Sequence, residues 1–282
     1  MQLQLRTRAL DLSAPVVMGV INVTPDSFSD GGCFANPEQA VARALEMAGE
    51  GAALLDVGGE STRPGATPVG VREELARVIP VIEALVAGGA PAVSIDTTKP
   101  EVMVAAASAG AELINDVKAL AEPGALEAAA ASGCAVCLMH MQGEPRTMQA
   151  APAYVDVVEE VYAFLAARIE ACVAANIGLE RIVIDPGFGF GKTLAHNLAL
   201  MNNLGCFTRL GVPVLVGVSR KSMLGAVTGR PMDERLAAGL AMATLAVCAG
   251  ARIIRSHDVA ATLDAVKMTG AVLAARDGGM QG

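Results

Sequence analysis

The chain has 282 residues, of which 53% are hydrophobic and 18% charged, and its formal net charge is −8 at pH 7. This apolar content excludes a disordered protein, because enough apolar surface can be buried to offset the entropy lost on ordering. The negative charge argues against nucleic acid as a partner, because no overall positive field would hold a polyanion.

The sequence also bears on the compartment of the protein. Residues 1–13 lack the apolar core of a signal peptide, and the longest apolar run, 236–251, falls short of the ~20 residues of a membrane span. Six cysteines are too few for a disulfide scaffold. Cys134 and Cys137 form a C-x-x-C at a predicted strand, and we interpret them as core side chains on opposite faces. We expect a reduced, cytoplasmic protein without membrane contact.

One unit recurs along the chain: a short β-branched run, a polar or glycine-rich stretch, and a longer segment rich in Ala and Leu. The short runs predict strands buried on both faces, as in a parallel sheet covered by helices. The predicted strands are 16–22, 53–57, 92–96, 112–117, 135–139, 181–185, 214–218 and 251–255. The predicted helices are 37–50, 72–86, 99–109, 123–132, 153–176, 194–204, 232–249 and 259–275.

These alternations predict an α/β fold, a single (β/α)8 TIM barrel, with its active site at the C-terminal ends of the strands. No Gly/Ser-rich or Pro-rich linker divides the chain, so we expect one domain over 1–282. A doubly wound open sheet is the alternative, but no phosphate-binding fingerprint follows its first strand.

Polar side chains stand at the end of every predicted strand. They are Asn22, Asp56, Asp96, Asn115 with Asp116, His140, Asp185, Ser219 with Arg220 and Lys221, and Arg255 with Ser256 and His257. One polar strand end can be a structural cap, but eight at one rim predict an active site there.

The last two strand ends carry cations, in the region where these barrels often bind phosphate. Lys221 follows the seventh strand, and Arg255 ends a β-branched run, so it is expected to point into the barrel. Such groups make a local anion site even in a negatively charged protein. Lys221 could alternatively form a Schiff base, but it begins a loop beside another cation instead of lying in an apolar strand.

Asp96, Asn115 and Asp185 end three further strands. They could bind a metal, or they could accept hydrogen bonds from adjacent N–H groups of a planar heterocycle. With three histidines in the chain, a multi-histidine zinc site is disfavoured. Acceptors with Lys221 as a donor suit a ring that carries amino, N–H and carbonyl groups, such as guanine or a pterin.

Three loops stand out. The connections at 22–32 and 58–65 exceed the usual length of about two to six residues, which predicts lids or binding loops. Residues 186–193 (PGFGFGKT) resemble a nucleotide-binding P-loop, but Pro186 stands where its first glycine is required. We instead expect the glycines to let the backbone approach a flat ligand, with Phe190 or Phe188 against one face.

Taken together, these motifs resemble the dihydropteroate synthases of folate biosynthesis, from residue 16 to about 258. The matching segments are 22–32 (NVTPDSFSDGG), 56–65 (DVGGESTRPG), 96–100 (DTTKP), 114–116 (IND), 138–142 (LMHMQ), 185–192 (DPGFGFGK), 219–222 (SRKS) and 255–258 (RSHD). The folate-dependent methyltransferases share the fold and an Asp/Asn/Asp pocket, but the loop motifs and SRKS favour the synthases.

The resemblance implies condensation of 6-hydroxymethyl-7,8-dihydropterin diphosphate with 4-aminobenzoate, giving 7,8-dihydropteroate and diphosphate. It implies a pterin site of Asp96, Asn115, Val117, Met139, Asp185, Phe190, Lys221 and Arg255, with Asp96, Lys221 and Arg255 as catalytic residues. It implies that Asn22, Arg63, Arg255 and His257 bind the diphosphate, with Asn22 as a ligand of Mg²⁺. It implies an aminobenzoate site of Phe28, Thr62, Arg63, Pro64, Lys221 and Ser222.

The resemblance further implies a homodimer, formed through helices late in the chain, and competition by sulfonamides as aminobenzoate mimics. Because no Ser/His or Cys/His nucleophile pair is present, we expect dissociative loss of diphosphate without a covalent enzyme intermediate. Two alternatives are a methyltransferase that uses a methyl-folate and a catalytically inactive pterin-binding paralogue.

Overall fold

The computed structural model describes residues 1–24, 37–61 and 66–277. Its larger sheet consists of eight parallel strands in the order β8-β7-β6-β5-β4-β3-β10-β9. They are β3 (Val16–Asn22), β4 (Leu54–Gly58), β5 (Ala92–Asp96), β6 (Leu113–Asp116), β7 (Ala135–Met139), β8 (Ile182–Asp185), β9 (Leu215–Gly217) and β10 (Ile253–Ser256). A parallel bridge between Ile184 and Val214 joins β8 to the start of β9. The strands therefore close in chain order, which confirms the (β/α)8 barrel and excludes the doubly wound sheet.

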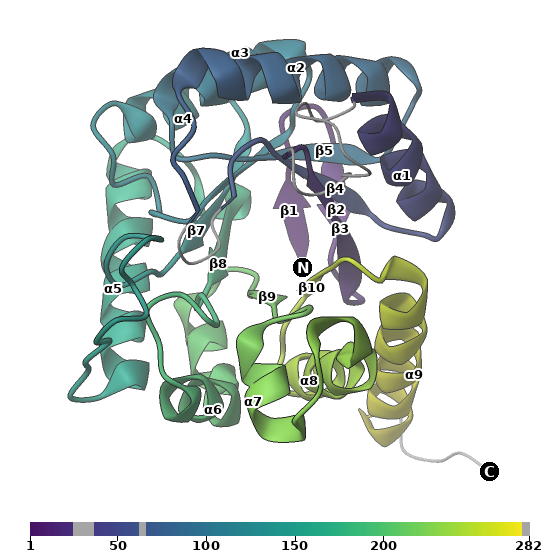
Figure 1. Ribbon diagram of the computed structural model, residues 1–282, viewed down its shortest axis with the longest axis vertical. Coiled ribbons are helices and arrows are strands. Elements are labelled where there is room, and N and C mark those ends of the chain that lie inside the picture. Colours follow the sequence, from purple (N-terminus) through teal and green to yellow (C-terminus); the bar gives the residue numbers. More distant parts are fainter. Residues whose placement is uncertain (25–36, 62–65, 278–282) are drawn as a thin grey trace.

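Helices form a ring around the strands (Figure 1). They are α1 (Pro37–Gly49), α2 (Val71–Ala87), α3 (Pro100–Ala109), α4 (Ala125–Ser132), α5 (Val157–Ala174), α6 (Leu194–Asn202), α7 (Ser222–Thr228), α8 (Leu236–Cys248) and α9 (Val259–Asp277). The turn Met232–Glu234 precedes α8. Among the helices within the described ranges, none is long and apolar enough to cross a membrane.

The strands divide the core into two apolar layers because successive side chains point to opposite faces. On β4, Leu55 and Val57 pack against the surrounding helices. Leu54 belongs to the cluster inside the barrel, together with residues such as Leu113, Val183 and Ile253. The inner cluster fills the part of the barrel where the strands begin, so only the opposite end is left for polar inward side chains.

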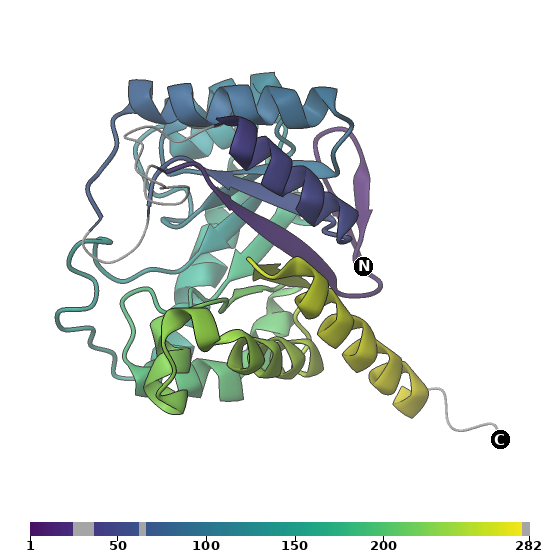
Figure 2. The same cartoon turned by 45° about the vertical axis from the view of Figure 1, so that its right-hand side comes forward.

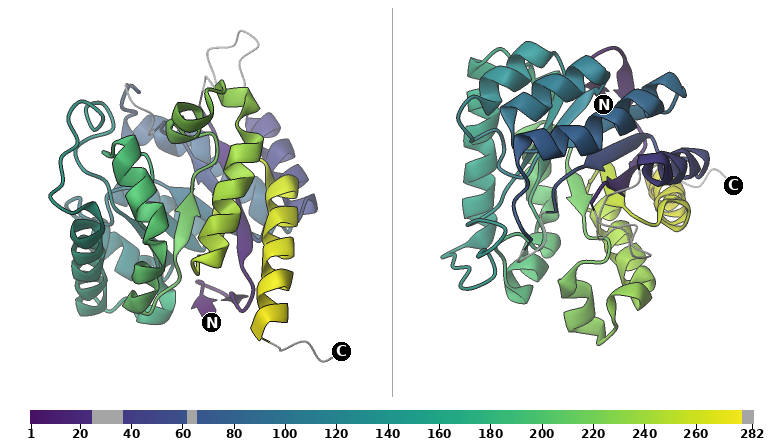
Figure 3. Two further views of the ribbon diagram at one scale, coloured as in Figure 1. Left: turned by 90° about the horizontal axis from the view of Figure 1, so that it is seen from below. Right: turned by 45° about the horizontal axis from the view of Figure 1, so that its top comes forward.

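A short antiparallel hairpin, β1 (Gln2–Gln4) and β2 (Ala9–Asp11), lies at the end of the barrel where the strands begin (Figure 3, left). Leu3 and Leu5 are fully buried in the inner cluster. This hairpin was not predicted, because strands of three residues are too short to show a period. The hairpin closes the floor of the barrel.

The burial of Leu3 in the hairpin can be tested by mutation. Leu3→Ala is expected to lower the free energy of unfolding by about 3 kcal/mol, because a fully buried leucine leaves a cavity on truncation. Urea unfolding would measure it. Gln2→Ala, on the exposed side of the same strand, is the matched control and should change stability by less than about 0.5 kcal/mol. Equal losses in the two variants would contradict the assignment of Leu3 to the core.

Some predicted boundaries were wrong. The predicted helix 153–176 begins at Val157, because the Asp156 carboxylate caps it by accepting from the N–H groups of Val158 and Glu159. The predicted helix 232–249 begins at Leu236, after a separate turn. The two-turn helix α7 was missed, because it follows the polar SRKS segment and ends after seven residues.

The interpretation of the C-x-x-C pair as core is confirmed. Cys134 and Cys137 are buried free thiols, and they lie in the outer and the inner cluster respectively. Burial raises the pKa of both thiols, which disfavours the reactive thiolate.

Candidate active site

The inward positions of the strands turn from apolar to polar toward their C-terminal ends. On β4 the inward residues are Leu54 and then Asp56, and on β6 they are Leu113 and then Asn115. Strands β8 and β10 repeat this change, with Val183 followed by Asp185 and Ile253 followed by Arg255. The two-residue period of a strand thus places one functional side chain per strand just above the apolar barrel core.

Three of these side chains, Asn115, Asp185 and Arg255, line a cavity of about 460 Å³ at the C-terminal ends of the strands. Its lining includes the predicted residues Asn22, Asp96, Asn115, Val117, Met139, Asp185, Phe190, Lys221, Ser222, Arg255 and His257. Phe28, Thr62, Arg63 and Pro64 lie outside the described residues. The predicted site residues that the structure describes therefore come together at one rim, although they are spread over most of the sequence.

Arg255 is the centre of a charged network in the cavity. Its Nε is 2.6 Å from Asp56 Oδ2 and its Nη2 is 2.9 Å from Asp96 Oδ2. Asn115 Nδ2 also donates to Asp56 Oδ2, at 2.9 Å, which leaves the amide oxygen of Asn115 as an acceptor toward the cavity. Burial opposes charging of Arg255, but the two carboxylates raise its pKa above the usual value. Arg255 points into the barrel, as predicted.

The network shifts the titration of Asp96. Burial, followed by the nearby Asp56 carboxylate, raises the pKa of Asp96 to about 7. The Asp96 carboxyl can therefore change charge near neutral pH while it faces the cavity.

Asp185 and Lys221 form the opposite part of the polar wall. Asp185 Oδ1 accepts from Gly187 N at 2.7 Å, and burial raises the pKa of this carboxyl. Burial also lowers the pKa of Lys221 to about 8, partly countered by Asp185. Lys221 Nζ lies 3.9 Å from the centre of the Phe190 ring, a cation–π distance. The cavity thus offers several acceptors and an ammonium donor beside an aromatic ring.

An apolar cluster covers another side of the cavity. Val117, Met139, Met148 and Phe190 are buried against one another. Of the two phenylalanines considered, Phe190 lines the cavity, whereas Phe188 is fully buried in the outer core. This cluster can cover the face of a flat ring whose edge meets Asp96, Asn115 and Asp185.

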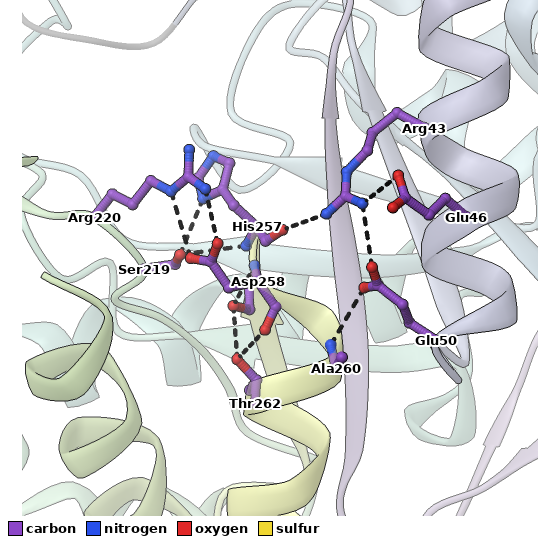
Figure 4. A network of polar contacts seen from close by, with 10 residues as sticks. Arg43, Glu46, Glu50, Ser219, Arg220, His257, Asp258, Ala260 and Thr262 are labelled. Atoms are coloured by element: carbon purple, nitrogen blue, oxygen red, sulfur yellow. Dashed lines mark hydrogen bonds and ion pairs between the residues drawn. The ribbon is translucent and has the colours of Figure 1, made fainter. Parts of the chain in front are cut away.

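His257 is held at the cavity rim by contacts from both sides of the barrel seam (Figure 4). Ser219 Oγ is 3.0 Å from His257 Nδ1, and Arg43 Nη2 of α1 donates to the His257 carbonyl at 3.2 Å. Arg220 pairs with Asp258 at 2.8 Å and adopts a left-handed backbone conformation with φ of 60°. The segment that carries Lys221 is therefore tied to the segment that carries His257.

Four polar strand-end residues do not line the cavity. Asp56 pairs with Arg255 and the Ser256 hydroxyl bonds to that of Thr262, whereas the other two, Asp116 and His140, have structural roles. Asp116 accepts from the N–H groups of Lys118 and Leu120, so it caps the following loop. His140 is buried beside Lys192, and burial lowers its pKa to about 3, which keeps the imidazole neutral. For these two residues the expectation of a place in the site was wrong, and the structural role is the correct one.

The role expected for the glycines of 186–193 also needs correction. Gly187 and Gly191 have φ of 72° and 60°, and a Cβ at these positions would collide with the carbonyl groups of His140 and Gln142. These glycines let the loop pack on the chain after β7 instead of on a ligand. Gly189 lines the cavity, but a Cβ there would lie 3.1 Å from Lys221 Cδ.

Sequence reasoning assigned no role to three residues that shape the site. Asp56 was noted as a strand end, and its position two residues after the apolar inward Leu54 is the signal that places it inside the barrel. Lys192 was named without a role, in the rejected P-loop and in the matching segment 185–192, although it is 2% exposed. Arg235 lines the cavity and donates to the carbonyls of Arg220 and Lys221, at 3.2 and 3.4 Å.

The donor set of the cavity does not resemble a resident metal centre. Within the described ranges, no group of three or more His, Cys, Asp or Glu side chains could hold a metal ion. Of the two carboxylates that were considered as metal ligands, Asp96 pairs with Arg255 and Asp185 accepts from the Gly187 N–H. Asn22 offers one amide oxygen at the cavity rim.

Comparison with known proteins agrees with this geometry. Residues 18–257 match the family model described as "Pterin binding enzyme". A dihydropteroate synthase of Escherichia coli (strain K12) is 51% identical over 277 residues, which cover 98% of each chain. A Yersinia pestis dihydropteroate synthase in complex with a sulfonamide drug superposes with a TM-score of 0.93 at 50% identity, covering 97% of this chain and 100% of that one.

A Xanthomonas albilineans dihydropteroate synthase in complex with 7,8-dihydropteroate has a TM-score of 0.88 and 51% identity, covering 97% of this chain and 99% of that one. These relatives match nearly the full length of the chain in both sequence and fold. The chain belongs to the pterin-binding enzymes and, among them, to the dihydropteroate synthase family.

Proposed function

We propose that the chain condenses 6-hydroxymethyl-7,8-dihydropterin diphosphate with 4-aminobenzoate to give 7,8-dihydropteroate and diphosphate. The observation that carries this proposal is the polar wall of the cavity, where Asp96, Asn115 and Asp185 offer acceptors and Lys221 offers a donor. This pattern complements the amino, N–H and carbonyl groups along one edge of a pterin. Val117, Met139 and Phe190 cover the face of the ring.

The reaction requires cleavage of a C–O bond, and the side chains at the cavity suit a dissociative path. A cation that develops at the exocyclic carbon is delocalised into the electron-rich dihydropterin, and the Asp96 carboxylate favours that charge. Arg255 and His257 line the cavity and would contact the oxygens of the departing diphosphate. The amine of 4-aminobenzoate, held beside Lys221 and Ser222, then attacks without a strong base.

The oxygen donors at the cavity rim suit Mg²⁺ that is bound mainly through the substrate. One amide oxygen, from Asn22, fits a hard cation that is bound mainly through substrate phosphates, as Mg²⁺ commonly is. We propose that Asn22 holds Mg²⁺ that accompanies the diphosphate, where the ion would neutralise charge on the leaving group. In this proposal Arg255 and Arg63 would contribute further positive charge, and the His257 ring would contribute a further hydrogen bond to the diphosphate.

The direct test is formation of dihydropteroate from the two purified substrates, with and without Mg²⁺. Product is expected only with Mg²⁺, and Asn22→Ala should raise the Mg²⁺ concentration needed for half-maximal rate by about tenfold, because one oxygen ligand is lost. Asn202→Ala, at the C-terminal end of α6, is the matched control. A methyltransferase would form no dihydropteroate, and an inactive paralogue would bind pterin without turnover.

Pterin affinity is expected to be highest between about pH 7 and 8. Asp96, whose pKa is raised to about 7, must lose its proton to accept a ring N–H, so binding weakens as pH falls through that value. Lys221, whose pKa is lowered to about 8, must keep its proton to donate to the ring carbonyl, so binding weakens as pH rises through that value. Titration calorimetry with 6-hydroxymethylpterin at several pH values would measure both limbs.

The variants that separate these limbs are Asp96→Asn and Lys221→Arg. Asp96→Asn should flatten the acid limb only, because the amide does not titrate in this range. Lys221→Arg should flatten the alkaline limb only, because a guanidinium stays charged. Profiles in which either variant keeps the wild-type limb would contradict the assignment of that limb.

We also propose one domain over 1–282, a cytoplasmic location, and a homodimer formed through α8 and α9. Support for the dimer comes from large apolar side chains exposed on these two helices: Leu236, Leu245, Met268 and Val272. Light scattering coupled to size exclusion would determine the mass of the particle. A monomer at micromolar concentration would contradict the dimer.

A further inference from the structure

Lys192 is a buried cation next to the cavity that the proposed mechanism does not use. Its side chain is 2% exposed. Lys192 Nζ donates to the carbonyls of Gly187, Phe190 and His140, at 2.9, 3.0 and 3.3 Å. Its nitrogen is also 2.9 Å from His140 Nδ1. A lysine buried this deeply is rare unless its N–H groups are satisfied, and here four acceptors surround it.

These contacts hold the loop after β8 against the chain after β7. Gly187 and Phe190 belong to the loop after β8, and His140 begins the chain after β7. Gly191 packs directly against Gln142, and the Tyr154 hydroxyl donates to the Gly191 carbonyl at 2.9 Å. Lys192 lies at the centre of this contact, because its ammonium is bonded to carbonyls on both sides.

The fastened loop carries part of the polar wall and part of its apolar cover. Asp185 precedes the loop and accepts from Gly187 N. Phe190, three residues after Gly187, lines the cavity, and the centre of its ring lies 3.9 Å from Lys221 Nζ. Release of the Gly187 and Phe190 carbonyls would therefore free the aromatic ring that covers the ligand face.

The groups around Lys192 determine its charge. Burial lowers its pKa to about 7, the Asp185 carboxylate opposes this shift, and Lys221 adds to it. His140 is neutral, because burial and Lys192 lower its pKa to about 3, and its Nδ1 lies 2.9 Å from Lys192 Nζ. With the proton on Nε2, the imidazole can serve as the fourth acceptor.

We propose that Lys192 is a positioning residue for pterin binding, which holds the loop 186–192 on the chain after β7 and thereby fixes Phe190 against Lys221. This inference rests on the proposed function, since it concerns the pterin site. Lys192 itself is not among the residues that line the cavity.

The test replaces Lys192 by methionine, which keeps an unbranched side chain and removes every N–H donor. The dissociation constant of 6-hydroxymethylpterin, measured by titration calorimetry, is expected to rise about tenfold, because the Phe190 ring loses its fixed place. In turnover, KM for the dihydropterin diphosphate should rise more than KM for 4-aminobenzoate. Lys192→Gln keeps two donors and should give an intermediate dissociation constant, which covers the case that the methionine variant does not fold.

Arg181→Met is the matched control. Arg181 donates to the Cys134 carbonyl at 2.6 Å, so it also ties the chain before β7 to the chain before β8, but at the opposite end of the barrel. Its loss should lower stability and leave the pterin dissociation constant unchanged. Equal loss of pterin affinity in Arg181→Met and Lys192→Met would show that Lys192 affects binding only through the stability of the protein, and would contradict the proposal.

A double-mutant cycle tests whether Lys192 acts through Phe190. Phe190→Ala and Lys192→Met should have non-additive effects on the pterin dissociation constant, because the ring that Lys192 fixes is missing in the first variant. Additive effects would overturn the proposal. Wild-type protein that fails to bind pterin would instead overturn the proposed function, whereas wild-type binding with an unaltered Lys192→Met variant would overturn only the role of Lys192.

Discussion

Replacing Asp185 by alanine is expected to raise the dissociation constant of 6-hydroxymethylpterin by roughly 100-fold, equivalent to about 3 kcal/mol. Asp185 is 6% exposed and lies in the polar wall of the cavity. In the variant, the buried N–H groups of a bound pterin would lose a charged acceptor and could not regain water. Titration calorimetry at pH 7.5 would measure the change.

Two further variants test whether the loss of affinity comes from the Asp185 carboxylate itself. Asp185→Asn keeps one oxygen acceptor, where the carboxylate offers one to Gly187 N and a second to the ligand, so its dissociation constant should rise less than that of the alanine variant, by about tenfold. Asp264→Ala, on the exposed surface of α9, should bind like the wild type. An Asp185→Ala protein that is folded by circular dichroism and binds pterin with wild-type affinity would falsify the assignment of the pterin edge.

Arg255→Met is expected to have the second large effect, a fall of about 3–5 kcal/mol in the free energy of unfolding. The substitution leaves two neighbouring carboxylates, Asp56 and Asp96, without their counter-ion, and Asp56 is fully buried. Turnover should fall by about 10²–10³-fold, because the cation proposed to contact the diphosphate is lost. Urea unfolding and the dihydropteroate assay would measure the two losses.

The control for Arg255 lies at the same rim. Arg220 pairs with Asp258, but their side chains are 44% and 31% exposed, so Arg220→Met should cost at most about 1 kcal/mol. The double variant Asp56→Asn with Arg255→Met removes one of the unpaired charges and should regain part of the stability but none of the turnover. If Arg220→Met were as destabilising as Arg255→Met, burial of the ion pairs could not explain the loss.

The sequence was sufficient for the barrel because each unit carries its own signal, a β-branched run followed by an Ala- and Leu-rich segment. Elements without such a signal were missed. The hairpin Gln2–Asp11 has strands of three residues, and α7 has seven residues after a polar start. The closing bridge between Ile184 and Val214 also leaves no trace in the sequence, since it depends on how far the sheet curves.

For the candidate site, the position of a residue along its strand was predictable, but its partner was not. The strand-end rule brought Asp96, Asn115 and Asp185 to one rim. The same rule misplaced His140, because whether a strand-end side chain faces the cavity or a loop depends on the local backbone. Lys192 was not identified, since three of its four acceptors are backbone carbonyls, and these are the same in every residue type.

The seam between the first and the last βα unit has a consequence for biosynthesis. Strand β3 pairs with β10, and Arg43 and Glu50 of the first unit contact His257 and Ala260 of the last (Figures 2 and 4). At ~5–20 residues per second, a ribosome needs on the order of 10 s or more to add the sequence between them. Throughout that interval the edge of β3 has no partner, so the nascent chain is open to association with other chains until its final strand emerges.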